Sequence, residues 1–209
     1  MLVVHHLNES RSHRILWLLE ELALPYEVRR YARNPQTRLA PPELAAVSPL
    51  GKAPALQLED GRVLIESGAI IETVIRRLGG GRLQPPDNSV EYDAYIQWLH
   101  YAEGSAMLPL MLHLYAGRLG EAAAPLMPRI EGEIANHLAF LDRSLQGRAW
   151  LVGDGLTGAD IQMSFVAEMA GVLGKRAAYP ALDAWVRALQ QRPAYRRAVE
   201  RGGAYGLGR

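Results

Sequence analysis

The sequence predicts an α/β domain followed by an all-α domain, and two observations support this fold class. Up to residue 80, short extended apolar runs alternate with helical spacing, whereas beyond residue 88 every extended apolar pattern has the spacing of a helix. The intervening residues 81–88 contain two prolines and mark a change of composition. We therefore expect a first domain over residues 1–80, a linker over 81–88 and a helical domain over 89–209.

The first domain has the predicted element order βαβ followed by ββα. Each strand is predicted from an apolar run bounded by turn residues, such as the Asp60-Gly61 turn between two short strands. Each helix is predicted from apolar residues three and four apart, and Pro25 prevents the first helix from continuing. The expected elements are a strand at 2–6, a helix with apolar positions 15, 18, 19 and 22, a strand at 26–31, a long connection at 34–49 with one helical turn near Pro42, strands at 55–58 and 63–65, and a helix over 67–78.

The second domain is expected to contain only helices. Their apolar positions are residues 92, 96 and 99; 134, 138, 141 and 145; 161 and 165; and 182, 185 and 189. Pro109 should kink or end the first of them, because proline lacks the backbone N–H that the helix requires. Thr157 and Asp160 have the spacing of a capping box, with Asp in place of the usual Glu, and predict the start of a buried helix.

Composition and charge argue against several classes of function. Of the 209 residues, 49% are hydrophobic and 22% are charged, as in proteins with a sizeable core. With 23 Lys and Arg against 22 Asp and Glu, the net charge of +1 provides no general attraction to nucleic acid or to an anionic membrane. The longest stretch without a charged residue has 14 residues, too few to span a bilayer, and the N-terminus shows no signal-peptide pattern. We expect a cytoplasmic protein.

The chain contains no cysteine. Disulfides, zinc sites with thiolate ligands and any mechanism with a protein thiol as nucleophile are therefore excluded. No metal site is expected from the six histidines, because His5 and His6 are adjacent on a predicted strand and point to opposite faces. The glycines at 153, 155 and 158 match a dinucleotide-binding spacing, but the required strand–helix context and downstream acid do not accompany them.

Three short polar segments of the first domain are candidates for ligand binding. The loop His6–Ser10 leads into the first helix, where backbone N–H groups and a hydroxyl favour an anion. The segment Gly51–Pro54 leads into a strand and predicts a cis peptide bond before the proline, which leaves backbone groups for an extended peptide. Glu66 and Ser67 open the next helix, where they suit an ammonium and a carboxylate. Each segment also has a simpler interpretation, as a helix cap or a plain turn.

Taken together and in this order, these segments resemble the cytosolic glutathione transferases. The sequence looks most similar to the bacterial and fungal members near the theta and phi classes. The resemblance covers nearly the whole chain and rests on residues 10–22, 40–44, 48–54, 65–70 and 157–161.

The resemblance implies a thioredoxin-like N-terminal domain that binds glutathione and a helical C-terminal domain that binds the electrophile, usually in a two-fold homodimer. It implies that Glu66 and Ser67 hold the γ-glutamyl end of glutathione. Ala53, beside a cis Pro54, would pair its backbone with the cysteinyl residue, and Lys52 would meet the glycyl carboxylate.

The group that activates the thiol is less evident. Relatives near these classes place a catalytic serine at the start of the first helix, but an ungapped count from the Leu-Pro-Tyr turn puts that position at Glu9. Ser10, at the junction of loop and helix, is the preferred candidate, and the alternatives are Ser12, Asn8 and His6.

The electrophile site is expected on the first long helix of the second domain. Its candidate residues are Tyr101, Glu103, Ser105, Met107 and Leu108. Tyr101, Ser105 and Leu108 are three to four residues apart and would share one face of a regular helix. Core packing or a dimer contact is an equally good interpretation of Met107 and Leu108.

We therefore expect a detoxifying transferase that conjugates glutathione to small hydrophobic electrophiles, with some capacity to reduce organic hydroperoxides. Glutathione is the co-substrate, and no prosthetic group is expected. Thiol-transferase chemistry is disfavoured, because it requires a mixed disulfide with a protein cysteine. The alternatives are a non-catalytic binding or regulatory module with the same fold, and a carrier that stores ligands.

Overall fold

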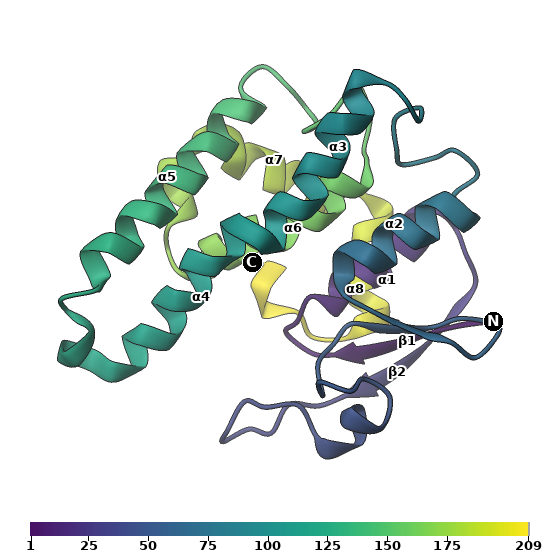
Figure 1. Ribbon diagram of the computed structural model, residues 1–209, viewed down its shortest axis with the longest axis horizontal. Coiled ribbons are helices and arrows are strands. Elements are labelled where there is room, and N and C mark those ends of the chain that lie inside the picture. The colour runs from purple at the N-terminus through teal and green to yellow at the C-terminus, as the bar shows by residue number, and fades with distance from the viewer. Residues whose placement is uncertain (209) are drawn as a thin grey trace. The chain divides into compact units, whose positions relative to one another are not determined.

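The computed structural model describes residues 1–208, which form two compact units (Figure 1). The first unit contains Met1–Gln84 and Leu189–Gly208, and the second contains Pro85–Ala188. The predicted fold class is confirmed, since the first unit combines a sheet with helices and the second is helical. The expected division differs at the C-terminus, where residues 189–208 pack with the first unit instead of extending the helical one.

A four-stranded mixed sheet lies in the first unit, with the strand order β2-β1-β3-β4. β1 (Leu2–Leu7) pairs in parallel with β2 (Tyr26–Tyr31), as a βαβ unit requires. β3 (Ala55–Gln57) pairs antiparallel with both β1 and β4 (Val63–Ile65). The predicted hairpin is therefore confirmed.

Two helices of the first unit pack against α1 (Ser12–Glu21). This helix contacts β1, α2 (Ser67–Leu78) and α8 (Pro193–Gly202), and Figure 1 shows the three helices grouped above β1 and β2. Residues Ser12–Leu19 of α1 are all buried, because other elements of the first unit pack against more than one face of the helix. The single turn expected near Pro42 is the short 3-10 helix η1 (Pro42–Ala46).

α8 joins the first unit through arginines that pair with the C-terminal turn of α1. The ion pairs are Arg192 Nε with Glu21 Oε1 at 2.6 Å, Arg197 Nε with Glu20 Oε2 at 2.7 Å, and Arg201 Nη1 with Glu20 Oε1 at 3.2 Å. The helical pattern of α8 is visible in the sequence, but the helix it packs against is not. The sequence alone therefore does not show that residues 189–208 pack with the first unit.

The second unit is built from helices and single turns. Its elements are α3 (Val90–Tyr101), the π-helix η2 (Ala102–Ala106), α4 (Met107–Ala116), the 3-10 helix η3 (Gly117–Ala123), α5 (Met127–Leu145), α6 (Gly158–Val172), the 3-10 helix η4 (Arg176–Ala178) and α7 (Pro180–Gln191), whose last residues belong to the first unit. Figure 1 shows α4 beside α5 and α3 beside α6, in agreement with their contacts. Within residues 1–208, no helix is long and apolar enough to cross a membrane.

α6 is the central helix of the second unit, and its start confirms the predicted capping box. The Thr157 hydroxyl accepts the Ala159 N–H, and the Asp160 carboxylate accepts the Thr157 N–H at 2.9 Å. Asp160 also accepts the Leu151 N–H at 2.9 Å. Burial raises the pKa of Asp160 to about 6, against the opposing effect of these hydrogen bonds.

The interruption predicted at Pro109 takes the form of a π-helix just before it. Pro109 lies in the first turn of α4 and cannot donate to the carbonyl four residues back, at Ser105. Instead, the Met107 N–H reaches back five residues to the Ala102 carbonyl. The helical path from α3 to α4 therefore contains one widened turn.

Candidate active site

Four strand ends meet at one end of the sheet. Leu7 at the end of β1 pairs with Tyr31 at the end of β2. His5 pairs with Ala55 at the start of β3, and Ala55 pairs with Ile65 at the end of β4. Continuing these registers by one or two residues brings together the loop after β1, the residues before β3 and the start of α2. All three polar segments singled out from the sequence therefore lie at this end of the first unit.

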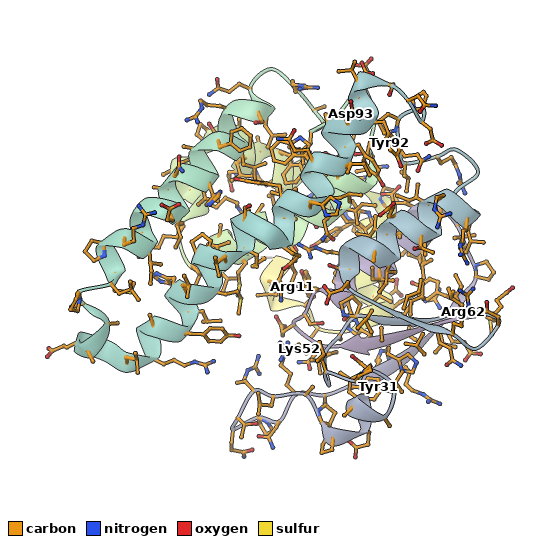
Figure 2. All side chains as sticks on the ribbon, in the orientation of Figure 1. Arg11, Tyr31, Lys52, Arg62, Tyr92 and Asp93 are labelled. Atoms are coloured by element: carbon orange, nitrogen blue, oxygen red, sulfur yellow. The ribbon has the colours of Figure 1, made fainter. Side chains whose placement is uncertain are left out.

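The segment before β3 contains the predicted cis peptide bond, between Ala53 and Pro54. Pro54 is buried, Ala53 is partly exposed and Lys52 is exposed. Figure 2 shows Lys52 and Arg11 toward one end of the sheet and Arg62 toward the other. An extended peptide laid along Ala53 would meet a backbone edge with an exposed ammonium beside it.

α2 begins at the same end with Glu66 and Ser67. Glu66 is exposed and has φ 68° and ψ 114°, a conformation that costs a non-glycine residue free energy and is often found at functional sites. Ser67 is only 4% exposed and is the first residue of the helix, so the simpler interpretation of Ser67 as the helix cap is wrong. The N-cap residue is Glu66, and its side chain makes no capping hydrogen bond.

The Ser67 hydroxyl accepts a hydrogen bond from the buried side chain of Arg14 in α1. Arg14 Nη1 donates to Ser67 Oγ at 3.1 Å, and Arg14 is 1% exposed. Because a guanidinium can only donate, Ser67 accepts here and its hydroxyl hydrogen is left to donate elsewhere. A buried cation and a helix N-terminus therefore lie together, which favours a carboxylate. Arg14 was not predicted as a site residue, because it stands within the apolar run of α1 and its partner is distant in sequence.

Three of the four candidate activating residues form one buried cluster. Ser12 Oγ lies 2.8 Å from Ser10 Oγ and 2.8 Å from His6 Nδ1. Ser10 Oγ donates to the Leu7 carbonyl at 2.7 Å, and Ser12 Oγ accepts the Leu7 N–H at 3.2 Å. Ser10 and Ser12 are 6% and 0% exposed. The structure brings these residues together, but their polar hydrogens are used within the cluster.

His6 turns its other ring nitrogen toward Gly202 of α8. A Cβ at Gly202 would lie 3.2 Å from His6 Nε2 and 2.8 Å from Leu16 Cδ1, so this close approach requires glycine. The hydrogen bond to the Gly202 backbone leaves Nδ1 to accept the Ser12 hydroxyl. Burial, reinforced by the charge of Arg30, lowers the pKa of His6 to about 4. A neutral imidazole with so low a pKa is a weak base for a thiol proton.

Asn8, the fourth candidate, is partly exposed and is oriented by a long-range contact. Its Oδ1 accepts the backbone N–H of Arg33 at 2.9 Å. Within residues 1–208 the Asn8 amide nitrogen makes no hydrogen bond, so its two hydrogens can donate to a ligand. Arg33 was not anticipated from the sequence, because only the pairing of β1 with β2 brings it to this loop.

Glu9 occupies the position at which related proteins place the catalytic serine, when residues are counted without gaps from the Leu-Pro-Tyr turn. Its side chain contacts the C-terminal segment of the first unit. Its Oε1 accepts the backbone N–H of Gly206 at 2.8 Å, at the start of the short 3-10 helix η5 (Gly206–Gly208). Its φ is 54°, in the left-handed region. An ionised carboxylate has no hydrogen to donate to a thiolate, so Glu9 does not replace a catalytic hydroxyl.

In the second unit, the Tyr101 side chain lies in an aromatic cluster between α3 and α5. Its hydroxyl lies 2.6 Å from His137 Nδ1, and its ring contacts Trp98 and Phe140 edge-on. Burial raises the pKa of Tyr101 to about 12. The hydroxyl of this candidate electrophile residue is therefore neutral and already paired within the second unit.

The other electrophile candidates follow Tyr101 through the π-helix. Glu103 and Ser105 lie within it and are partly exposed. Because the π-helix widens one turn, Ser105 and Leu108 are not at regular α-helical spacing from Tyr101, and the expectation of one shared face does not hold. Leu108 is 57% exposed, whereas Met107 is 2% exposed and belongs to the core.

The fold places a cis-proline segment before β3 and a hydroxyl backed by a buried arginine at the start of α2 on an α/β domain, and a helical domain follows in the sequence. Residues 10–77 match the family model of the glutathione S-transferase N-terminal domain, and residues 96–193 match that of the C-terminal domain. The chain belongs to the glutathione S-transferase family.

Individual relatives cover nearly the whole chain. Glutathione S-transferase 3 of Schizosaccharomyces pombe is 33% identical over 96% of this chain and 88% of its own. The crystal structure of a glutathione S-transferase from Actinobacillus pleuropneumoniae is 35% identical, with a TM-score of 0.90 over 100% of this chain and 96% of that one. A sphingomonad glutathione S-transferase, solved in complex with glutathione, is 26% identical, with a TM-score of 0.76 over 96% of this chain and 98% of that one.

Proposed function

We propose that the protein is a catalytic glutathione transferase that joins the thiol of glutathione to small hydrophobic electrophiles. The observation that carries the proposal is the meeting of four groups at one end of the sheet: an exposed carboxylate, a hydroxyl backed by a buried cation, a backbone edge and an exposed ammonium. Glutathione has an ammonium, two carboxylates and peptide groups, so it offers each of these four groups a partner.

The registers suggest how glutathione would lie. Glu66 would accept the γ-glutamyl ammonium, while Ser67 and the N-terminal backbone of α2 would hold the adjoining carboxylate. Ala53 would pair with the cysteinyl backbone, and Lys52 would meet the glycyl carboxylate. Since the β1–β3 register, continued by two residues, places Ala53 opposite Leu7, the cysteinyl sulfur would lie beside the loop after β1.

For activation of the thiol, the geometry favours Asn8 over Ser10. Ser10 can donate to a sulfur only by giving up its bond to the Leu7 carbonyl, whereas the Asn8 amide nitrogen is already available. Lowering a thiol pKa by about two units from about 8.5 requires roughly 2.7 kcal/mol of preferential stabilisation of the thiolate. One amide hydrogen bond to an anion, together with the N-terminus of α1, supplies this order of magnitude.

The exposed face of α4 suits a hydrophobic electrophile. Leu108, Leu112 and Tyr115 recur three and four residues apart and are 57%, 42% and 55% exposed. We propose that this face, rather than the Tyr101 cluster, contributes apolar surface to the electrophile site. A contact with a second copy of the chain is the competing role for these side chains.

The decisive experiment for the function is turnover with glutathione and a chromogenic electrophile. Glu66→Ala should weaken glutathione binding by about 1.5–3 kcal/mol, because a charge-assisted hydrogen bond is lost. Glu59→Ala is the matched control, since Glu59 is an exposed glutamate at the other end of the same hairpin. Glutathione binding without turnover of any electrophile would favour the alternative, a non-catalytic module or carrier with this fold.

The same site would activate glutathione for the reduction of organic hydroperoxides, and the same preparation tests that reaction. We further propose a cytoplasmic, detoxifying role and a homodimer, as expected from the family resemblance. The molar mass in solution tests the dimer directly.

A further inference from the structure

Arg33, just after β2, lies against the backbone of the loop that follows β1. Its Nε donates to the Asn8 carbonyl at 3.0 Å, and its Nη2 donates to the Glu9 carbonyl at 3.0 Å. Its Nη1 donates to the Arg38 carbonyl at 2.9 Å, in the turn that follows. One guanidinium group therefore joins two segments through three backbone carbonyls.

This contact requires the shape of arginine. A guanidinium is planar and directs its N–H groups in a fixed fork, so it can donate to two carbonyls of adjacent residues and to a third on its other side. A lysine ammonium is a single point of donation and cannot reach all three acceptors in these directions. Arg33 is only partly exposed, so less of this charge-assisted contact is lost to solvent than at an open surface.

Arg33 also determines how the Asn8 side chain is oriented. The Arg33 backbone N–H binds Asn8 Oδ1, while the Arg33 side chain binds the Asn8 carbonyl. Both ends of Asn8 are thereby held, and the side-chain nitrogen is directed away from these contacts. The neighbouring Glu9 keeps a φ of 54°, a costly conformation that persists only where surrounding contacts enforce it.

We propose that Arg33 is a positioning residue for thiol activation, which holds the loop of Asn8 and Glu9 so that the Asn8 amide donates to the sulfur of bound glutathione. This inference rests on the proposed function and adds a residue to it that need not touch glutathione itself. Arg33 acts through the loop, so its loss changes the ionisation of the thiol more than the affinity for the rest of the tripeptide.

The test compares Arg33→Ala and Arg33→Lys with the control Arg30→Ala. Arg30 lies in β2, three residues before Arg33, and it too donates to a backbone carbonyl, that of Arg201 in α8, but not to the loop. Four quantities are measured: the thiol pKa of bound glutathione from the absorbance of its thiolate, kcat and KM for conjugation, and the affinity for S-methylglutathione. The last ligand has no thiol and reports only on the rest of the site.

We expect the thiol pKa to rise by about one unit in Arg33→Ala, with a roughly tenfold fall in kcat below that pKa. S-methylglutathione affinity should change less than threefold, and Arg33→Lys should resemble Arg33→Ala. Low concentrations of guanidinium ion should restore part of the activity of Arg33→Ala but not of Arg30→Ala. In a double variant with Asn8→Ala, the two shifts in thiol pKa should not add, because both act through one amide.

An unchanged thiol pKa in Arg33→Ala would overturn the inference, as would wild-type behaviour of Arg33→Lys or fully additive shifts in the double variant. If Arg33→Ala does not fold, Arg33→Lys and the double variant built on it decide the matter by the same thiol titration. Absence of turnover and of glutathione binding in the unsubstituted protein would instead contradict the proposed function.

Discussion

Replacing Arg14 by methionine should weaken glutathione binding through one specific group of the ligand. Arg14 Nη1 donates to Ser67 Oγ at 3.1 Å from a position that is 1% exposed. In the proposed mode of binding, the Ser67 hydroxyl would then no longer be oriented toward the γ-glutamyl carboxylate, and a buried positive charge behind the start of α2 would be lost. Hydrogen bonds that involve a charged group contribute about 1.5–3 kcal/mol each, so we expect the binding free energy of glutathione to weaken by about this amount.

Calorimetry with two ligands separates this effect from general damage. The second ligand is a glutathione analogue in which the γ-glutamyl α-carboxylate is replaced by hydrogen. Arg14→Met should lower the affinity for glutathione at least tenfold, or about 1.4 kcal/mol, and change the affinity for the analogue much less. Ser67→Ala should act in the same way, and the double variant should be little worse than either single one. Equal losses for both ligands would refute the argument and make Arg14 a purely structural residue.

Three further predictions concern stability and the electrophile. His6 has a folded-state pKa of about 4, against 6.5 when unfolded, so its contribution to stability is complete above pH 6.5 and is lost as the pH falls. By pH 5, denaturant unfolding should show that the free energy of unfolding has fallen by about 2 kcal/mol. This loss should be absent in His6→Asn. The effect of Asp160 on stability has the opposite dependence on pH, because the pKa of Asp160 is raised to about 6. Relative to Asp160→Asn, the unsubstituted protein should gain stability as the pH falls from 6 to 4.5, and a relative loss of stability would contradict this. Leu108→Ser should change the preference among electrophiles without changing glutathione affinity, and an altered dimer mass with unchanged preference would assign α4 to a subunit contact.

Much of the first unit could be predicted from the sequence, because the residues that end its strands and helices lie next to those elements in the chain. Pro25 and the Asp60-Gly61 turn indicate where elements end, and the residues around Pro54 indicate a cis bond. The capping box of Thr157 and Asp160 is likewise a contact between residues three apart, and its prediction is confirmed.

The predictions that needed correction depend on contacts between distant residues. Nothing near Arg14 or Arg33 in the sequence shows that they meet Ser67 and Asn8, because those contacts exist only once the strands have paired. The position of α8 against α1 is of the same kind. Pro109 predicts a break in the helix, but the sequence does not show that the break is a π-helix, and hence that the face shared by Tyr101, Ser105 and Leu108 is lost.

Whether this end of the sheet activates a thiol is measured by the pKa of the glutathione thiol when bound to the unsubstituted protein, read from thiolate absorbance across a pH series. We expect a value about two units below the usual pKa of about 8.5 of a free thiol, because the sulfur would lie beside the Asn8 amide and the N-terminus of α1. Bound glutathione that titrates like free glutathione would contradict the claim that this end of the sheet activates a thiol.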